Sequence, residues 1–423
     1  MKVFKFGGAS VKSADSIENV ARILRTYQNE KLVVVVSAMG KMTNRFEDLL
    51  HRWQQGLETD NLLEEIQRFH YDIAKGLFQD PQARVFTRLK ELFEEIEQMI
   101  GNEPSGDFNF DYDQLVCFGE VLSTVIVFEY LQSSGFKAEW VDIRNIIKTD
   151  NRHREANVDW INSAKGAEIL ASHLAEEHVQ LLVTQGFVGG SALGNTSTLG
   201  REGSDYSAAI IAYLADATSV TIWKDVPGML NADPKWFANT VKLDKISYRE
   251  AIELAYYGAS VIHPKTIKPL QNKNIPLYVK SFFDPNAPGT VIQESMDYDK
   301  LVPSYIFKAN QELVSISPRD FSFIVEENLS EIFQVLSEIG IKINLMQNGA
   351  INFSICVDEN TEKLDRLRNM LSRKYEIKYN TGVELLTIRH HDPQILRQIT
   401  AGYEVLVEQR TRSTLRMVLR RVS

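Results

Sequence analysis

The stretch VFKFGGAS, residues 3–10, is typical of a short strand that ends in two glycines. Glycines after a strand let the chain turn sharply and bring backbone N–H groups close to an anion, and Lys5 adds a positive charge there. Residues 13–24 then place their apolar side chains on one helical stripe, and LVVVVSA (32–38) is apolar on both faces. A strand, a helix and a doubly buried strand in this order predict a parallel sheet covered by helices.

The same alternation continues to about residue 295. Residues 45–100 are expected to be mostly helical and polar, and an apolar helix is expected at 118–135. Further strands are expected in AEWVDI (138–143), VQLLVTQG (179–186), SVTIWKDV (219–226) and PLYVKSF (276–282). Residues 1–295 therefore predict one large α/β domain, in which ligands bind beyond the carboxyl ends of the strands.

The sequence pattern changes after residue 300. Residues 310–381 predict a β-α-β-β-α-β unit, and residues 382–423 predict a second, shorter unit of the same kind. Such small units leave a sheet edge and one face exposed, so pairing with another copy would bury them. We therefore expect a homodimer formed through residues 300–423.

Composition narrows the class of protein. The 423 residues are 44% hydrophobic and 24% charged, with a net charge of −9, which disfavours nucleic acids and anionic membranes as partners. Only Cys117 and Cys356 are present, without a CxxC pattern, which indicates a reducing compartment. No apolar run reaches the ~20 residues that a membrane span needs. A cytoplasmic metabolic enzyme is the expectation.

Glycine-rich turns recur at four strand ends. TLGREGSDYSAA (198–209) leads into a predicted helix whose N-terminal amides could bind phosphate. The other three turns are KFGGAS (5–10), GFVGG (186–190) and KDVPGMLNADP (224–234). Together they predict a shared cleft for a polyphosphate. The chain has no GxxxxGK[ST] loop and no HRD or DFG pair, so it is neither a P-loop enzyme nor a protein kinase.

In sequence order, these turns, SAMGKMTN (37–44), FGE (118–120) and YGASVIHPKT (257–266) together resemble the amino-acid kinase superfamily and, within it, the aspartate kinases. The C-terminal repeat is similar to ACT domains. The resemblance implies a three-layer α/β/α sandwich with a mainly parallel sheet, followed by an α+β, ferredoxin-like ACT regulatory region. It also implies phosphorylation of the side-chain carboxylate of L-aspartate by MgATP, which gives 4-phospho-L-aspartate for lysine, threonine and methionine synthesis.

The residue types suit this chemistry. A carboxylate nucleophile is ionised at neutral pH, so positive charge, Mg²⁺ and positioning matter more than proton transfer. Lys5 with the amides of Gly7 and Gly8 would hold the phosphates. Arg201 offers a planar fork for the α-carboxylate, and Glu120 would bind the α-ammonium group. An ordinary surface role for Arg201 stays open, whereas an unpaired carboxylate such as Glu120 in an apolar helix is costly unless it is functional.

The resemblance extends to further site residues. Asp205 would orient Lys5 or the metal-bound phosphates, although a plain helix-capping role remains the alternative. No side chain is expected to bind the metal directly, since Mg²⁺ would arrive with ATP. On the substrate side the resemblance adds Ser37, Thr43 and Ser204, and on the ATP side it adds Ser10, Lys224, Asp225, Lys235 and Ser260.

Three positions depart from the family pattern. Glu202 replaces a glycine and adds negative charge beside the cleft, so it must point away or be paired. Ser260 stands where a lysine often contacts ATP, and Lys224 or Lys265 could supply the missing charge. Leu230 replaces a frequent tyrosine, so nucleotide stacking is not expected there.

The regulatory region leaves more open. INLMQNGAINFS (343–354) has Asn344 and Ala350 where lysine-inhibited relatives carry acids, which predicts weak or no inhibition by lysine. An amino-acid effector of another kind remains possible for the ACT region. Two other functions are the alternatives: a superfamily member acting on glutamate, acetylglutamate or a nucleoside monophosphate, and a catalytically weakened ACT-type amino-acid sensor or regulatory subunit.

Overall fold

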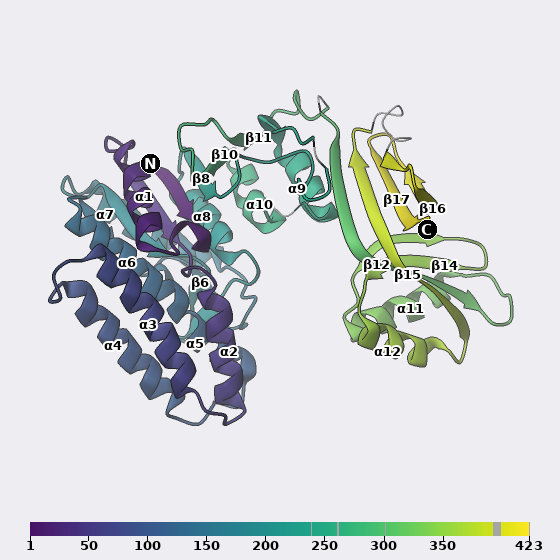
Figure 1. The fold of residues 1–423 in the computed structure, drawn as a ribbon, viewed down its shortest axis with the longest axis horizontal. Helices are drawn as coiled ribbons and strands as arrows, with labels where there is room; N and C mark the ends of the chain where they lie inside the picture. Colours follow the sequence, from purple (N-terminus) through teal and green to yellow (C-terminus); the bar gives the residue numbers. More distant parts are fainter. Residues whose placement is uncertain (238, 260–261, 301, 392–398, 423) are drawn as a thin grey trace. The chain divides into compact units, whose positions relative to one another are not determined.

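The computed structural model describes residues 1–237, 239–259, 262–300, 302–391 and 399–422 (Figure 1). The chain forms two compact units. The first comprises Met1–Met229, Lys242–Ile252 and Val261–Tyr298, and the second comprises Leu230–Val241, Glu253–Ser260 and Asp299–Ser423. The second unit thus includes two segments from the predicted catalytic region. Ser260 lies outside the described residues.

An eight-stranded sheet is the centre of the first unit, in the order β3-β5-β2-β1-β8-β10-β11-β9. Neighbouring strands are parallel except for the antiparallel pair β10 and β11. The strands are β1 (Lys2–Phe6), β2 (Leu32–Val36), β3 (Ala138–Trp140), β5 (Leu181–Gln185), β8 (Ser219–Lys224), β9 (Lys245–Ser247), β10 (Leu277–Ser281) and β11 (Thr290–Gln293). Every residue of β2 and β5 is buried, as expected for parallel strands between two helical layers. The predicted three-layer α/β/α sandwich with a mainly parallel sheet is confirmed.

Ten α-helices are described before residue 300. They are α1 (Ala14–Arg25), α2 (Met42–Gln54), α3 (Asp60–Leu77), α4 (Arg84–Ile100), α5 (Phe108–Val116), α6 (Phe118–Ser133), α7 (Trp160–Ala175), α8 (Gly203–Leu214), α9 (Tyr248–Tyr257) and α10 (Pro264–Asn272). The polar region predicted to be helical forms α2, α3 and α4, which pack together and against α6 (Figure 1).

Helix α6 is apolar and buried around nearly its whole circumference. Together with α5 it forms the helical stretch Phe108–Ser133, which by length and composition could cross a membrane. Because 89% of its most apolar window is buried inside the protein, packing in the interior explains this composition. Glu120 lies in the first turn of α6, so the helix carries a charged group into the interior.

A small three-stranded sheet, β4-β6-β7, lies beside the main one in the first unit. Its strands are β4 (Lys148–Thr149), β6 (Val188–Ser191) and β7 (Thr196–Thr198). The last three residues of the GFVGG segment (186–190) belong to β6, the central strand of this sheet. Strand β7 leads directly into the turn that precedes α8, so the small sheet positions the N-terminus of that helix.

The second unit contains a six-stranded antiparallel sheet in the order β13-β14-β12-β15-β17-β16. Helices α11 (Glu326–Ile339) and α12 (Thr361–Leu371) complete the predicted β-α-β-β-α-β order. The strands are β12 (Ser304–Pro318), β13 (Ile343–Asn348), β14 (Phe353–Asp358), β15 (Tyr375–Arg389), β16 (Tyr403–Arg410) and β17 (Thr414–Arg421). Because β12 and β15 each span 15 residues, they join the two predicted ACT-type halves into one continuous sheet.

Candidate active site

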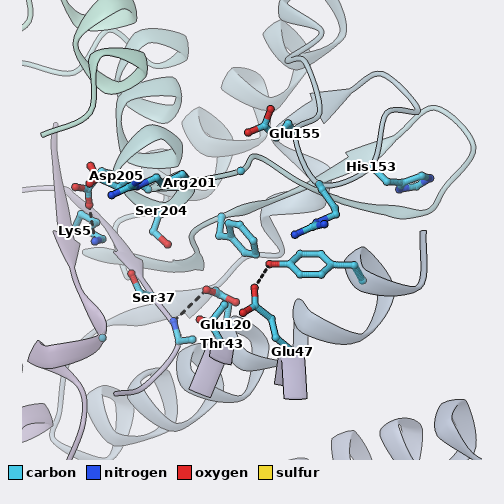
Figure 2. A pocket seen from close by; sticks show the side chains of 18 of the residues that line it. Lys5, Ser37, Thr43, Glu47, Glu120, His153, Glu155, Arg201, Ser204 and Asp205 are labelled. Carbon is cyan, nitrogen blue, oxygen red and sulfur yellow. Dashed lines mark hydrogen bonds and ion pairs between the residues drawn. The ribbon is translucent and has the colours of Figure 1, made fainter. Parts of the chain in front are cut away.

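The carboxyl ends of β1, β2, β5 and β8 surround a pocket of about 1000 Å³ (Figure 2). Parallel strands bring their ends to the same edge of the sheet, which is where ligands of such folds bind. The lining residues are Lys5, Gly8, Ser37, Ala38, Gly40, Thr43, Glu47, Asn109, Tyr112, Glu120, Arg152, His153, Arg154, Glu155, Phe187, Gly200, Arg201, Glu202, Gly203, Ser204, Asp205 and Lys224.

A buried ion-pair cluster marks one end of the pocket. Lys5 Nζ, near the end of β1, lies 2.5 Å from Asp205 Oδ1, and Lys224 Nζ, at the end of β8, lies 3.4 Å from Asp205 Oδ2. Asp205 is only 2% exposed and occupies the first turn of α8, where the positive end of the helix dipole stabilises a negative charge. Burial alone would raise the pKa of Asp205, yet Lys5 and Lys224 hold it below its usual value.

Two glycines are required by close packing near this cluster. A Cβ on Gly8 would lie 2.6 Å from the carbonyl oxygen of Ala38, and Gly40 donates its backbone N–H to Gly8 at 3.0 Å. A Cβ on Gly186 would lie 2.4 Å from Cβ of Ser204. The glycines therefore let the strand-end loops and the N-terminus of α8 approach closely enough to enclose the pocket.

Glu120 lines the same pocket and has a different environment. Its side chain is buried, its Oε1 accepts a long hydrogen bond of 3.4 Å from the amide of Ala38, and no described residue bonds to its Oε2. Desolvation raises the pKa of Glu120 to about 8, because the Ala38 amide and the more distant Lys5 compensate only in part. A cationic group of a ligand could supply the missing partner.

Glu202, the residue that replaces a family glycine, has a left-handed backbone. Its φ is 54° and its ψ is 28° at the N-cap of α8. Such a conformation costs a non-glycine residue about 1–2 kcal/mol, so glycine is the residue that this position favours. Glu202 lines the pocket, and no described residue bonds to its buried Oε2. The expectation that Glu202 would point away or be paired is therefore wrong for this atom.

All five predicted substrate residues are brought together. Ser37, Thr43, Glu120, Arg201 and Ser204 all line the pocket with Lys5 and Asp205 (Figure 2). Arg201 is exposed and forms no ion pair with any described residue.

The predicted ATP residues are placed less uniformly. Gly8 and Lys224 line the pocket, whereas Gly7, Ser10 and Asp225 do not. Ser10 is 2% exposed because it turns toward the interior, and Asp225 is exposed. Lys235 belongs to the second unit. Their roles stay predictions.

Sequence reasoning missed one wall of the pocket. Tyr112 donates its hydroxyl to Glu47 Oε1 at 2.7 Å, and the guanidinium of Arg154 lies 4.5 Å from the centre of the Tyr112 ring. These residues come from α2, α5 and the loop after β4, and no motif connects them. One feature of the sequence could have drawn attention to Arg154, namely the run of charges RHRE at 152–155.

The amino acid kinase family matches residues 1–281 of the chain. Among curated proteins, lysine-sensitive aspartokinase 3 of Escherichia coli is 31% identical over 358 residues, which cover 84% of this chain and 78% of that protein. Chloroplastic aspartokinase 1 of Arabidopsis thaliana is 33% identical over 370 residues, covering 84% and 63%. The chain spans only 39% of a bifunctional aspartokinase/homoserine dehydrogenase of Zea mays.

Two solved structures of E. coli aspartokinase III are similar over nearly the whole chain. The complex with aspartate and ADP in the R-state has a TM-score of 0.81 at 27% identity, covering 99% of this chain and 96% of that one. The complex with lysine and aspartate in the T-state has a TM-score of 0.82 at 27% identity, covering 99% and 95%.

Proposed function

The chain belongs to the amino acid kinase family and, within it, to the aspartokinases, and on that basis we propose that it phosphorylates L-aspartate with ATP. One observation supports this most strongly. A lysine-neutralised Asp205 and an unpartnered Glu120 face the same pocket, so the site offers positive charge for phosphates and a carboxylate for an ammonium group. ATP and a zwitterionic amino acid carry these complementary groups.

The reaction needs no general base. An oxygen of the substrate's side-chain carboxylate bonds to the γ-phosphorus while the bond from phosphorus to the β–γ bridging oxygen breaks, which gives 4-phospho-L-aspartate and ADP. The main obstacle is repulsion between two anions. Lys5 and Lys224 lower that repulsion, and Asp205 holds both ammonium groups in place before the substrates arrive.

Mg²⁺ fits this arrangement as a companion of ATP. Both oxygens of Asp205 face ammonium groups, so they are already engaged. We therefore expect the phosphate oxygens of ATP to hold the ion, with no side-chain ligand required. When bound, Mg²⁺ neutralises charge on the phosphates.

The amino-acid end selects the substrate. Glu120 would bind the α-ammonium group, because that contact supplies the partner that its Oε2 lacks. Arg201 lines the same pocket and has no acidic partner among the described residues, so its guanidinium can bind the α-carboxylate. Ser37, Thr43 and Ser204 add hydroxyl groups around the substrate.

The test is turnover by the purified protein with MgATP and L-aspartate. Hydroxylamine would trap the acyl phosphate as a hydroxamate, and ADP release would be measured in parallel, with L-glutamate as the comparison substrate. Aspartate-dependent hydroxamate is the expected result. Amino-acid binding without turnover would instead support the sensor or regulatory-subunit function.

The second unit is consistent with a homodimer. Its sheet ends in the edge strands β13 and β16. Phe321, Phe323 and Met346 are 82%, 69% and 52% exposed, which leaves apolar area near the β13 edge that a second copy could bury. Sedimentation of the full chain would test this, and a monomer at micromolar concentration would contradict it.

An effector role for lysine is not expected. Asn344 is engaged by Lys308 at 2.9 Å, Gln311 at 2.7 Å and Asp358 at 2.8 Å. Its side chain therefore already has partners within the protein, and it lacks the negative charge that an effector amine would seek. Another amino acid remains the expected kind of effector for the ACT-type region.

The cytoplasm is the compartment we expect. Cys117 and Cys356 are both buried and free, which suits a reducing environment. In the proposed setting the product feeds the synthesis of lysine, threonine and methionine.

A further inference from the structure

We propose that Arg154 is an additional substrate-binding residue that receives the α-carboxylate of the amino-acid substrate beside Arg201. This inference rests on the proposed aspartate kinase function. The residue lines the same pocket as Lys5 and Glu120. Four observations carry the proposal: its backbone conformation, the anchoring of its loop, the support of its guanidinium, and the charges around it.

The backbone of Arg154 adopts a conformation that non-glycine residues rarely take, with φ at 67°. Such conformations persist only where the surroundings hold them. Asp113 provides that hold, because both of its oxygens accept the amide N–H of Arg154 at 3.1 Å. The same carboxylate bonds His153 Nδ1 at 2.8 Å and accepts the hydroxyl of Thr198 at 2.6 Å.

Asp113 is completely buried on α5, so the anchor is rigid. It ties the loop that contains Arg154 to β7, the strand that leads into the turn before Ser204 and Asp205. The position of Arg154 is therefore fixed relative to the N-terminus of α8. A residue that merely fills a surface loop needs no such connection.

Two aromatic rings support the guanidinium. It lies 4.5 Å from the centre of the Tyr112 ring and 5.6 Å from that of Phe108. Stacking on a ring face leaves the N–H groups at the rim of the guanidinium available for a carboxylate. The Tyr112 ring is itself held in place, because its hydroxyl donates to Glu47.

The charges around Arg154 leave room for an anion. No carboxylate of the described residues forms an ion pair with its guanidinium, although several acids line the same pocket. Glu47, which fixes the Tyr112 ring, lies on the far side of Glu120 from the Lys5–Asp205 pair (Figure 2). Arg154 is therefore at the amino-acid end of the pocket, where Glu120 would hold the ammonium group of the same substrate.

One carboxylate can satisfy both arginines. Its two oxygens offer about four lone-pair sites, so Arg154 and Arg201 can share it once the exposed Arg201 side chain, drawn beside Asp205 in Figure 2, turns toward Glu120. The pairing would match the zwitterion, with Glu120 for the α-ammonium group and two guanidinium groups for the α-carboxylate. The side-chain carboxylate remains free to react at the Lys5 end.

The test uses Arg154→Gly in the full-length protein, because glycine tolerates the left-handed backbone while the side chain is removed. We expect the aspartate KM to rise about ten- to a hundredfold, the loss typical of a hydrogen bond to a charged group. The ATP KM should change little, and the melting temperature should not fall, because relief of the left-handed backbone offsets the loss of the ring contacts. Asn274→Gly, which also relieves a left-handed residue (φ 53°) but lies away from the pocket, is the matched control.

A substrate analogue separates binding from a structural role. The α-amide of aspartate lacks the negative charge, so Arg154→Gly should weaken its binding far less than it weakens that of aspartate. Equal losses for both ligands, or an unchanged aspartate KM in an active variant, would overturn the inference alone. Absence of aspartate turnover in the unmodified protein would overturn the proposed function and this inference together.

Discussion

The two ends of the pocket each bury a carboxylate to nearly the same extent, but the surroundings shift the pKa values of these carboxylates in opposite directions. Asp205 is 2% exposed and Glu120 is 3% exposed. Asp205 faces two lysines, and its pKa lies below the usual value. Glu120 has one long hydrogen bond, and its pKa rises to about 8.

The difference shows that burial alone does not decide the charge of an active-site acid. At the phosphoryl end the protein supplies the counter-charges itself, so the site is organised before ATP binds. At the amino-acid end the protein provides no counter-charge for Glu120, which lowers the stability of the folded protein. The substrate's ammonium group would supply that charge.

Lys5→Met should have the largest effect on activity. It removes the cation closest to Asp205, and loss of one such preorganised group typically lowers kcat by about a hundred- to a thousandfold. Steady-state kinetics would measure this. Lys2→Met, on the same strand but in a surface pair with Glu30, is the control. If the kcat of Lys5→Met stayed within twofold of that of the unmodified protein, Lys5 would have no catalytic role.

Glu120→Gln should come second, with an aspartate KM raised about ten- to a hundredfold by loss of the charged contact to ammonium. The control is Glu129→Gln on the same helix, which removes a carboxylate that is already paired with Arg88 at 3.0 Å. The aspartate KM of this variant should stay unchanged. Equal KM changes in the two variants would indicate a general disturbance of α6.

Stability offers a second test of Glu120. Its pKa is raised from 4.5 to about 8 in the folded protein, so the folded state binds more protons than the unfolded state between these values. The contribution of Glu120 therefore lowers the free energy of unfolding as the pH rises through this interval. Urea unfolding at pH 6 and pH 8.5 should show a smaller loss for Glu120→Gln than for the unmodified protein.

Lys224→Ala should have a smaller effect than Lys5→Met, because its Nζ lies farther from Asp205, at 3.4 Å. A change in the ATP KM or kcat on the order of tenfold is expected for one lost charged contact. If both constants stay unchanged, Lys224 cannot be the residue that compensates for the serine at position 260.

Glu202→Gly should give the smallest change, a gain of about 1 kcal/mol in the free energy of unfolding, because glycine fits the left-handed backbone. Glu202→Ala removes the same charge and keeps the strain. A similar gain in both variants would trace the effect to charge rather than to backbone conformation.

The sequence predicts the fold well where local pattern and topology agree. Doubly apolar strands such as β2 and the glycines at strand ends indicate a parallel sheet with a ligand pocket at one edge, and both are found. Lys5 and Asp205, 200 positions apart, could be paired only through the resemblance to a family, since no periodicity links them.

Other features depend on tertiary structure alone. The contact of Tyr112, Glu47 and Arg154 brings three segments together without any shared motif. The left-handed backbone of Arg154 is equally hidden, because an arginine gives no local signal for a positive φ, whereas at Glu202 the glycine of the family pattern does. Tertiary contacts impose such a backbone conformation, as the hydrogen bonds from the Arg154 amide to Asp113 do, and only the three-dimensional structure shows these contacts.

Calorimetry of aspartate binding would test the contrast between the two ends most directly. At pH 7 the free protein should hold Glu120 largely protonated, and the substrate's ammonium group should drive its ionisation, releasing about one proton per aspartate bound. The binding heat would then vary with the ionisation enthalpy of the buffer, and Glu120→Gln would abolish that dependence. Aspartate binding with no proton release in any buffer would contradict the account in which Glu120 lacks a partner in the free protein and gains the substrate's ammonium group on binding.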